Sequence, residues 1–193
     1  MMFKQLTRVT RAMAAPVAGA ALALALAFSL SAEAALPVGS VAPRFTSEAA
    51  LAGKTVPFSL EQSLGKGPTV LYFFPAAFTE GCTIEAHAFA EATEQFNQLG
   101  AAVVGVTAGN VERVAEFSRV ECRDKFAVVA DPGALIAKQY RTQIGSAIGP
   151  ISSRTSFVIA PDGKILLAYT SDDPYEHIKR TLAAVQAWHK KHG

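Results

Sequence analysis

The residues best able to do covalent chemistry are the two cysteines of the chain, Cys82 and Cys122. Cys82 lies in the stretch FFPAAFTEGCTIEAHAF, residues 73–89, where an apolar strand pattern gives way to a helical one. The unpaired N–H groups in the first turn of a helix, and the partial positive charge there, favour a thiolate over a thiol. The sequence therefore predicts a candidate nucleophile at the start of a helix.

The spacing along this helix places Cys82 on its buried side. Cys82 precedes Phe89 by seven residues and Phe96 by fourteen, so the three share one face. A lone helix cysteine is more often a small buried hydrophobe than a nucleophile. Two neighbours favour the functional interpretation, because Pro75 ends the strand and shapes the loop, and Thr79 can bring a hydroxyl beside the thiolate.

A fixed positive charge would complete such a site by holding the thiolate and polarising a substrate oxygen. Arg154 stands in the segment SRTSF, residues 153–157, at the start of an otherwise apolar strand pattern. An arginine there could equally be a surface charge at a strand end. The sequence alone does not show that this strand lies beside the helix of Cys82.

The elements that must position these residues alternate along the chain. Residues 38–45 are a proline-punctuated opening segment, Asn110 is a plausible helix N-cap, and Gly145, Gly149 and Pro150 indicate a loop. We expect strands at residues 54–60, 69–74, 102–107, 126–130, 155–160 and 164–170, and helices at residues 82–99, 110–123, 133–140 and 174–190. This order predicts an α/β sandwich with a mixed sheet.

The order of elements resembles that of a thioredoxin-like domain, a three-layer sandwich with a central mixed sheet flanked by helices. Within it, Pro75-x-x-x-Thr79-x-x-Cys82 resembles the peroxidatic signature of the peroxiredoxins, and Arg154 in R-x-S-F matches their distal arginine. The resemblance extends from the opening VGSVAPRF, residues 38–45, to TSFVIAPDGKI, residues 155–165. Among the peroxiredoxins, the sequence is most similar to the Q type, also called bacterioferritin comigratory protein.

The resemblance implies a thiol-dependent peroxidase that reduces hydrogen peroxide and organic hydroperoxides. The Cys82 thiolate would attack the terminal peroxide oxygen, water or an alcohol would leave, and Cys82 would become a sulfenic acid. Thr79 and Arg154 would orient the peroxide and bind its oxygens, and Pro75 would shield the sulfenic acid from water. The implied partners are the peroxide and a thioredoxin-like or other thiol reductant, with no metal or organic cofactor.

The step that follows sulfenic acid formation is left open by the sequence. Many Q-type members carry a resolving cysteine five residues after the first one, where this chain has His87, which reads as a partly exposed helix histidine. Cys122 is the tentative resolving residue, because it is the only other cysteine and some peroxiredoxins place theirs in that helix. It would form an intramolecular disulfide with Cys82. The alternative is a buried structural Cys122 and a one-cysteine enzyme reduced by an external thiol.

Other classes of protein fit the pattern less well. A thioredoxin-like disulfide oxidoreductase needs a C-x-x-C pair, but Thr83, Ile84 and Glu85 follow Cys82. A copper-handling thioredoxin-like protein would need a close cysteine pair and a histidine ligand. A non-catalytic binding or chaperone module would not need the assembled cysteine, threonine and arginine.

Residues 1–34 have the pattern of a cleaved secretory signal peptide. Three basic residues among the first eleven precede an apolar run at residues 14–30, and Ala32-Glu33-Ala34 places small residues where a signal peptidase reads. The run is shorter than the roughly 20 residues of a membrane-spanning helix. We therefore expect cleavage after Ala34, export to a bacterial periplasm, and a single thioredoxin-like peroxiredoxin domain at residues 35–193.

The charge balance of the predicted mature domain bears on the kinds of partner to expect. The whole chain has 18 basic and 16 acidic residues, and loss of residues 1–34 removes three basic residues and one acidic residue. The remaining domain is formally neutral, so nothing favours nucleic acid or an anionic membrane as a partner. The resemblance implies a monomer or a weak homodimer.

Overall fold

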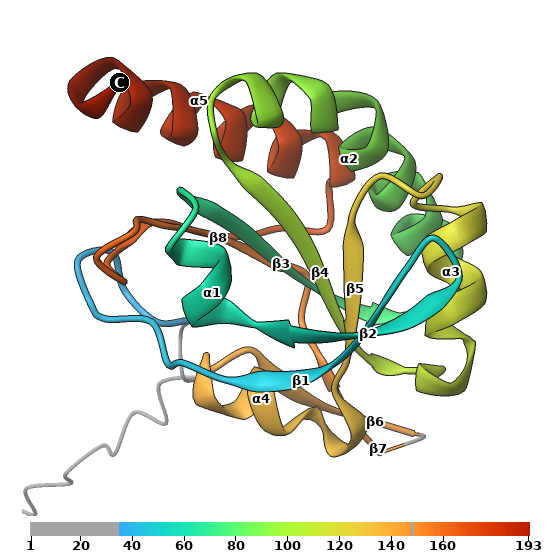
Figure 1. Cartoon of the computed structure of the whole chain (residues 1–193). Helices are drawn as coiled ribbons and strands as arrows, with labels where there is room; N and C mark the ends of the chain where they lie inside the picture. The colour runs from blue at the N-terminus through green and yellow to red at the C-terminus, as the bar shows by residue number, and fades with distance from the viewer. Residues whose placement is uncertain (1–34, 148) are drawn as a thin grey trace, which may run out of the picture. The chain divides into compact units, whose positions relative to one another are not determined.

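The computed structural model of the chain describes residues 35–147 and 149–193. The predicted signal peptide lies outside the described residues. Within them, one sheet contains seven strands in the order β2-β1-β5-β4-β3-β8-β9, and β6 pairs with β7 as a separate hairpin (Figure 1). The strands are Thr46–Leu51 (β1), Lys54–Ser59 (β2), Thr69–Ala76 (β3), Ala102–Gly109 (β4), Ala127–Ala130 (β5), Gln143–Ser146 (β6), Gly149–Ser152 (β7), Thr155–Ile159 (β8) and Ile165–Thr170 (β9).

Helices cover both faces of this sheet. They are Leu60–Leu64 (α1), Glu80–Gln98 (α2), Val114–Val120 (α3), Leu135–Gln139 (α4) and Pro174–His192 (α5), with 3₁₀ turns at Val111–Arg113 and Pro132–Ala134. One apolar cluster joins the sheet to α2, α3 and α5, and a second joins it to α1 and α4. β3, β4 and β5 run parallel, whereas β1, β2, β8 and β9 join antiparallel. The predicted three-layer sandwich with a mixed central sheet is confirmed.

The central strand β3 supplies both layers of the core. Tyr72 and Phe74 enter the cluster beneath α2, and Leu71 and Phe73 enter the cluster on the other face. All four are fully buried, as expected for aromatic and branched residues on a strand covered on both sides. Burial of the leucine and of each phenylalanine stabilises the fold by about 1.5–3 kcal/mol. The strand that leads into the Cys82 helix is thus one of the most firmly held elements.

The prediction that Pro75 ends its strand is wrong, because β3 continues through Pro75 to Ala76. Pairing of β3 with β8 has already ended at Phe73 opposite Thr155. The register with β4 then passes from Phe74 opposite Thr107 to Ala76 opposite Gly109. No ladder partner therefore requires an N–H from Pro75, and this allows a proline inside the strand.

We predicted that Asn110 caps a helix, but its side chain does not do so. Its backbone is left-handed, with φ of 55°, and its side chain makes no capping hydrogen bond. Instead its Nδ2 donates to the Ala77 carbonyl at 2.7 Å, across to the loop before α2. α3 begins only at Val114, after a 3₁₀ turn, and ends at Val120, so Cys122 lies in the turn beyond the helix.

Short elements account for the other differences from the prediction. β1 was not predicted, because its sequence TSEAAL alternates poorly; it pairs with β2 through a tight turn at Ala52 and Gly53, where φ is 52° and 76°. α1 was also missed. The β6–β7 hairpin occupies residues that we predicted as a loop. We missed it because its strands are short and mostly exposed and contain glycine and proline, which are typical of loops.

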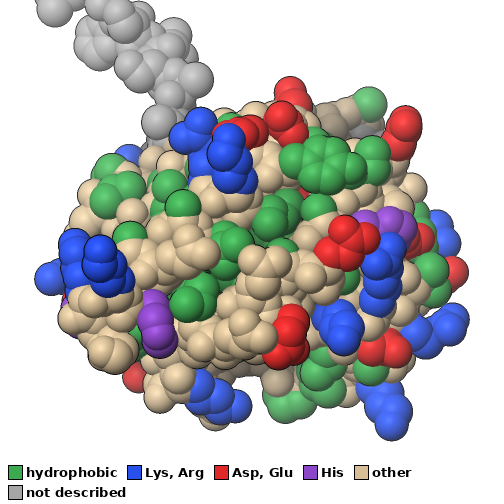
Figure 2. All heavy atoms as spheres, turned by 90° about the horizontal axis from the view of Figure 1, so that it is seen from above, with side chains coloured by type: hydrophobic (Ala, Val, Ile, Leu, Met, Phe, Trp, Pro, Cys, Tyr) green, Lys and Arg blue, Asp and Glu red, His purple; other side chains and the backbone are tan. Residues whose placement is uncertain are grey.

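The surface carries charges of both signs. On the face seen in Figure 2, basic and acidic side chains are interspersed, and the basic ones do not merge into one extended patch. None of the helices in the described part of the chain is long and apolar enough to cross a membrane.

Candidate active site

Cys82 is the third residue of α2 and is fully buried. Thr79 is the N-cap, with extended backbone angles, and its carbonyl accepts the first helical hydrogen bond from the Thr83 N–H at 2.9 Å. The sulfur therefore belongs to the first turn, where backbone N–H groups lack intrahelical partners and favour an anion. The predicted placement of Cys82 at the start of a helix agrees with the structure, with the helix beginning two residues earlier than expected.

Arg154 lies directly beside the thiol. Its Nη2 donates to the Cys82 Sγ at 3.5 Å, and its side chain is only 9% exposed. The antiparallel pairing of β8 with β3 brings the start of β8 to the end of the strand that leads into α2. The structure thus brings together two residues that are 72 positions apart in the sequence.

Gly81 is the residue that lets the guanidinium approach α2. A Cβ built on Gly81 would lie 3.0 Å from the Arg154 Nη2, closer than side chains normally pack. A glycine is therefore favoured at this position for steric reasons, because the Cβ of any other residue would crowd the guanidinium that contacts Cys82.

Glu85 is the second partner of Arg154. It is fully buried one helical turn after Cys82, and its Oε2 accepts from the Arg154 Nη1. Burial raises the pKa of Glu85 to about 8, although the charge and hydrogen bond of Arg154 act to lower it. Its Oε1 has no hydrogen-bond partner among the described residues. Arg154 therefore lies between two acidic groups, the thiol and the carboxyl.

His177, from α5, lies behind Glu85. Its Nδ1 is 3.8 Å from the Glu85 Oε1 and 2.8 Å from the Ser156 Oγ, while its Nε2 is 2.9 Å from the Ser171 carbonyl oxygen. The imidazole is fully buried, and burial together with the charge of Arg154 lowers the pKa of His177. The buried polar cluster around Cys82 thus draws on α2, β8 and α5.

Sequence reasoning missed Glu85 and His177. For Glu85 a signal was available, because it follows Cys82 by three residues and so must share its inward face. An acidic residue on an inward face calls for a buried cation, and Arg154 is that cation. His177 gave no such signal, because nothing in the sequence shows that the start of α5 packs against α2.

Thr79 and Pro75 occupy the loop that leads to Cys82. The Thr79 hydroxyl donates to the Ala76 carbonyl at 3.2 Å, and within the described residues it makes no hydrogen bond to the thiol. That hydrogen bond fixes the hydroxyl at the first turn of α2 and leaves its lone pairs unused. Pro75 is half-buried at the end of β3.

Phe78 completes the loop with an unusual backbone. Its φ of 62° lies in the left-handed region, which aromatic residues seldom adopt. The ring packs against Phe117 of α3 at a centroid distance of 5.2 Å, and the guanidinium of Arg113 lies over it at 3.8 Å. These contacts hold the loop in the conformation that presents Thr79 and Cys82.

Cys122 is a free, fully buried thiol in the same apolar cluster as Cys82. Burial raises its pKa well above the usual value, the charge of Glu121 raises it further, and the Tyr72 hydroxyl acts to lower it. Cys122 is therefore held as an unreactive thiol while the turn around it is folded.

His87, at the position where the resemblance to the Q type led us to look for a resolving cysteine, forms an ion pair with the residue next to Cys122. Its Nε2 lies 2.6 Å from the Glu121 Oε2, and its side chain is 37% exposed. One turn further along α2, Glu91 pairs with Arg123 at 3.2 Å. Two ion pairs thus connect α2 to the residues on either side of Cys122.

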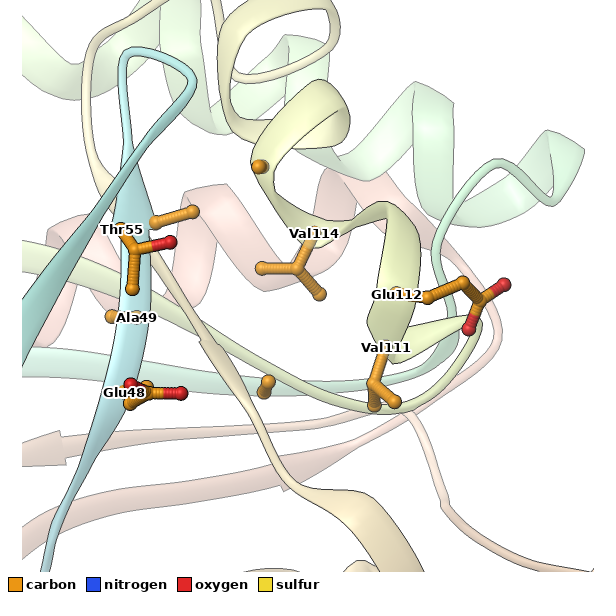
Figure 3. A pocket seen from close by; sticks show the side chains of 9 residues that line it. Glu48, Ala49, Thr55, Val111, Glu112 and Val114 are labelled. Atoms are coloured by element: carbon orange, nitrogen blue, oxygen red, sulfur yellow. The ribbon is translucent and has the colours of Figure 1, made fainter.

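Other features of the described residues take no part in this cluster. No group of three His, Cys, Asp or Glu side chains in residues 35–147 and 149–193 is arranged to hold a metal ion. A cavity of about 150 Å³ between β1 and the start of α3 is lined by Glu48, Thr55 and Glu112 among others (Figure 3). Neither Cys82 nor Arg154 lines it.

Comparisons of the sequence with known families point to one of them. Residues 38–168 match the AhpC/TSA family. The chain is 33% identical over 132 residues to chloroplastic peroxiredoxin Q of Sedum lineare, covering 68% of this chain and 69% of that protein. It is 34% identical over 149 residues to chloroplastic peroxiredoxin Q of Triticum aestivum, covering 77% of this chain and 66% of that protein.

Solved structures agree with these relatives. Peroxidoxin BcpB from Mycobacterium tuberculosis has a TM-score of 0.71 and 30% sequence identity, covering 79% of this chain and 97% of that chain. The peroxiredoxin Q structure from Xylella fastidiosa has a TM-score of 0.68 at 23% identity, which supports the fold. The fold is therefore the thioredoxin-like fold of peroxiredoxins, as predicted. From the matched family, the relatives and the shared fold, we conclude that the chain belongs to the AhpC/TSA family and is a peroxiredoxin, a thiol-dependent peroxidase.

Proposed function

We propose that Cys82 is the peroxidatic residue of this enzyme and that Arg154 activates it. The observation that carries the proposal is the 3.5 Å contact from the Arg154 Nη2 to the Cys82 Sγ in the first turn of α2. A guanidinium and a helix N-terminus both favour the thiolate, which is the nucleophilic form.

The first step is a two-electron transfer from sulfur to peroxide. The thiolate attacks the terminal oxygen, a sulfur–oxygen bond forms, and the oxygen–oxygen bond breaks. The leaving oxygen takes a proton and departs as water or an alcohol, and Cys82 remains as a sulfenic acid. Negative charge shifts onto the peroxide oxygens during attack, so the cation of Arg154 stabilises the transition state as well as the thiolate.

Thr79 and Pro75 complete the proposed site. With its proton directed at the Ala76 carbonyl, the Thr79 hydroxyl offers lone pairs to the peroxide O–H. Pro75 carries no N–H and fills the rim with an apolar ring, which limits the access of water to the sulfenic acid.

We further propose that Cys122 resolves the sulfenic acid. Its sulfur attacks the Cys82 sulfur, a disulfide forms, and the hydroxyl leaves as water with the thiol proton. Because Cys122 is buried and its pKa is raised, this step requires local opening of the turn that holds it. A thioredoxin-like or other dithiol then reduces the disulfide. The same burial also supports the alternative, a one-cysteine cycle that ends with an external thiol on Cys82.

The activity test uses two single variants. Cys82→Ser should lose peroxide consumption while keeping its circular dichroism spectrum, because the serine hydroxyl is not ionised at neutral pH. Cys122→Ser, also a buried thiol-to-hydroxyl change, should keep the first turnover. A Cys82→Ser variant that reduces hydrogen peroxide as fast as the parent would refute the assignment.

Resolution is tested by mass spectrometry of the protein treated with an excess of peroxide over Cys82 and no reductant. A Cys82–Cys122 disulfide peptide from a monomer supports the two-cysteine cycle. A hyperoxidised Cys82 with Cys122 still free supports the one-cysteine cycle and overturns the role of Cys122.

We also propose that the enzyme works in a bacterial periplasm after cleavage at Ala34, as a monomer or a weak homodimer. The pattern of residues 1–34 supports export. The predicted mature domain is formally neutral, and the face seen in Figure 2 carries charges of both signs, which gives no reason to expect nucleic acid or an anionic membrane as a partner. In that compartment the reductant would have to be an exported thiol protein or a small thiol.

A further inference from the structure

Tyr72 of β3 places a phenol hydroxyl inside the apolar cluster that contains both cysteines. Its side chain is fully buried, and no group among the described residues forms a hydrogen bond of normal geometry with the hydroxyl. A buried hydroxyl without a partner destabilises a fold, whereas a phenylalanine would fill the same space without that cost. Packing alone therefore does not explain the hydroxyl.

Neighbouring aromatic rings and a glycine fix the position of this hydroxyl. The Tyr72 ring stacks on Phe89 of α2 at a centroid distance of 4.4 Å. It packs edge-on against Phe126, four residues after Cys122, at 5.8 Å. Tyr72 stands opposite Gly105 of β4, and a Cβ on that glycine would lie 3.0 Å from the hydroxyl oxygen. The glycine thus leaves room for the oxygen in a ring that spans from α2 to the segment after Cys122.

The turn after α3 holds the Cys122 thiol close to the hydroxyl. The Cys122 N–H donates to the Phe117 carbonyl at 3.1 Å, and its carbonyl accepts from the Lys125 N–H at 2.9 Å. Cys122 is fully buried and belongs to the same cluster as Tyr72. Within that cluster, the hydroxyl faces the Cys122 sulfur.

Ionisation of Cys122 strengthens its contact with the hydroxyl. Burial, and then the charge of Cys122, keep the pKa of Tyr72 well above its usual value, so the phenol remains a donor. Burial also raises the pKa of Cys122, the charge of Glu121 raises it further, and the hydrogen bond from Tyr72 acts to lower it. A thiol sulfur accepts weakly and a thiolate strongly. The contact is therefore loose in the resting protein and tightens as the thiolate forms.

The resolving step makes use of such a donor. The Cys122 sulfur loses its proton and attacks the Cys82 sulfenic acid, the sulfur–sulfur bond forms, and the sulfur–oxygen bond breaks. The Cys82 sulfur is reduced, the Cys122 sulfur is oxidised, and the leaving hydroxide takes the thiol proton to give water. Tyr72 keeps its own proton throughout. Because β3 is paired with β4 and β8, the hydroxyl stays in place while the turn around Cys122 opens.

The hydroxyl also lies near the other cysteine. Its ionisable and charged neighbours are Cys122, Glu85, Cys82 and Arg154. An opening that carries the Cys122 sulfur towards Cys82 therefore keeps that sulfur near the hydroxyl.

We propose that Tyr72 is a catalytic residue of the resolving step: its buried hydroxyl donates a hydrogen bond to the Cys122 sulfur as that sulfur ionises and attacks Cys82. This inference rests on the proposed role of Cys122 as the resolving cysteine. It explains why the core holds a tyrosine where a phenylalanine would pack at lower cost.

The test follows a single turnover of the reduced protein with one equivalent of hydrogen peroxide and no reductant. Acid quenching, alkylation of the remaining thiols and mass spectrometry give two rates, the loss of the Cys82 thiol and the formation of the Cys82–Cys122 disulfide. In Tyr72→Phe we expect disulfide formation to slow by about threefold or more. A thiolate fraction that is about tenfold smaller is partly offset by the higher nucleophilicity of a more basic thiolate.

Tyr140→Phe is the matched control. Tyr140 is fully buried in the other apolar cluster, and its hydroxyl donates to the Pro43 carbonyl at 2.7 Å. This variant should lose stability in urea, because it loses that hydrogen bond, and should form the disulfide at the parent rate. Tyr72→Phe should be at least as stable as the parent, so a slower disulfide in this variant does not come from a weakened fold.

The possible outcomes separate this proposal from those it rests on. Disulfide formation at the parent rate in Tyr72→Phe, or an equal slowing of both rates, would refute the role of Tyr72. A parent protein that forms no Cys82–Cys122 disulfide would refute the resolving role of Cys122, and the role of Tyr72 with it. A parent protein whose Cys82 does not react would refute the peroxidatic assignment itself.

Discussion

At the scale of single residues, the guanidinium of Arg154 is the centre of the site. It contacts the Cys82 sulfur with one nitrogen and the Glu85 carboxyl with another. This geometry suits arginine, because its planar guanidinium can donate hydrogen bonds to two acidic groups at once. A lysine has the same charge but a single point of contact.

Substitution of Arg154 should separate charge from geometry. Arg154→Met removes the cation that stabilises the developing charge and should lower the second-order rate with peroxide by about 10²–10³, the usual loss for such a donor. Arg154→Lys should recover part of this loss. Stopped-flow measurement of Cys82 oxidation gives both rates, and equal rates for the methionine variant and the parent would exclude Arg154 from the reaction.

Glu85 should make stability depend on pH. Its pKa is raised from 4.5 to about 8 on folding, so the folded state holds a proton that the unfolded state has released. The free energy of unfolding should therefore fall as pH rises from about 4.5 through about 8. His177 has the opposite sign, because its lowered pKa weakens the fold as pH falls.

Urea denaturation at about pH 5.5 and about pH 8 measures this effect. The parent should lose more stability over that interval than Glu85→Gln, which cannot ionise. The same loss in both proteins would mean that Glu85 is already ionised in the folded state.

At the scale of elements, α2 contacts its neighbours through small steric and ionic details. Gly81→Ala would place a methyl group 3.0 Å from the Arg154 Nη2. We expect the guanidinium to retreat from Cys82 and the rate with peroxide to fall about tenfold or more, with the fold retained. Gly145→Ala, where the space around the glycine is open, is the matched control. Equal rates for the two alanine variants would contradict the role of Gly81.

The two ion pairs from α2 should slow disulfide formation. His87 with Glu121, and Glu91 with Arg123, connect α2 to the turn that holds Cys122. The pair of Glu91 with Arg123 is exposed and the pair of His87 with Glu121 is partly exposed, and ion pairs at the surface contribute about 0–1 kcal/mol each, so their loss should speed opening of the turn up to several-fold. The variant His87→Ala/Glu91→Ala should therefore form the Cys82–Cys122 disulfide faster after peroxide treatment. Slower formation would show that the pairs assist the reaction rather than restrain it.

Element patterns explain which parts of the site were predictable. Cys82, Thr79 and Pro75 are close in sequence, so one strand–loop–helix pattern placed all three. The pairing of β8 with β3, which brings Arg154 to Cys82, could only be expected from the resemblance to known domains. His177 depends on the packing of α5 against α2, a tertiary contact with no sequence periodicity. The short β1, β6 and β7 lacked the alternation that reveals a longer strand.

At the scale of the whole molecule, the described residues contain every group proposed for the first chemical step. β3 holds Pro75, α2 holds Cys82 behind its N-cap Thr79, and Arg154 directly precedes β8. The sandwich was predictable because long apolar strands alternate with amphipathic helices, and both patterns survive in the fold.

Maturation gives a prediction at this scale. The full chain produced in a bacterium with a periplasm should yield a secreted protein whose first residue is Ala35, which N-terminal sequencing can identify. Residues 35–193 produced alone should react with peroxide at the same rate. A product that keeps residues 1–34 in the membrane fraction would contradict cleavage.

The central claim, that Cys82 is the residue that peroxide oxidises, is tested most directly by trapping its sulfenic acid. The protein is treated with one equivalent of hydrogen peroxide in the presence of dimedone, and the labelled peptide is identified by mass spectrometry in the Cys122→Ser variant. We predict a single adduct on Cys82, which Arg154→Met should reduce strongly. Rapid peroxide consumption without an adduct, disulfide or higher oxide on Cys82 would contradict it.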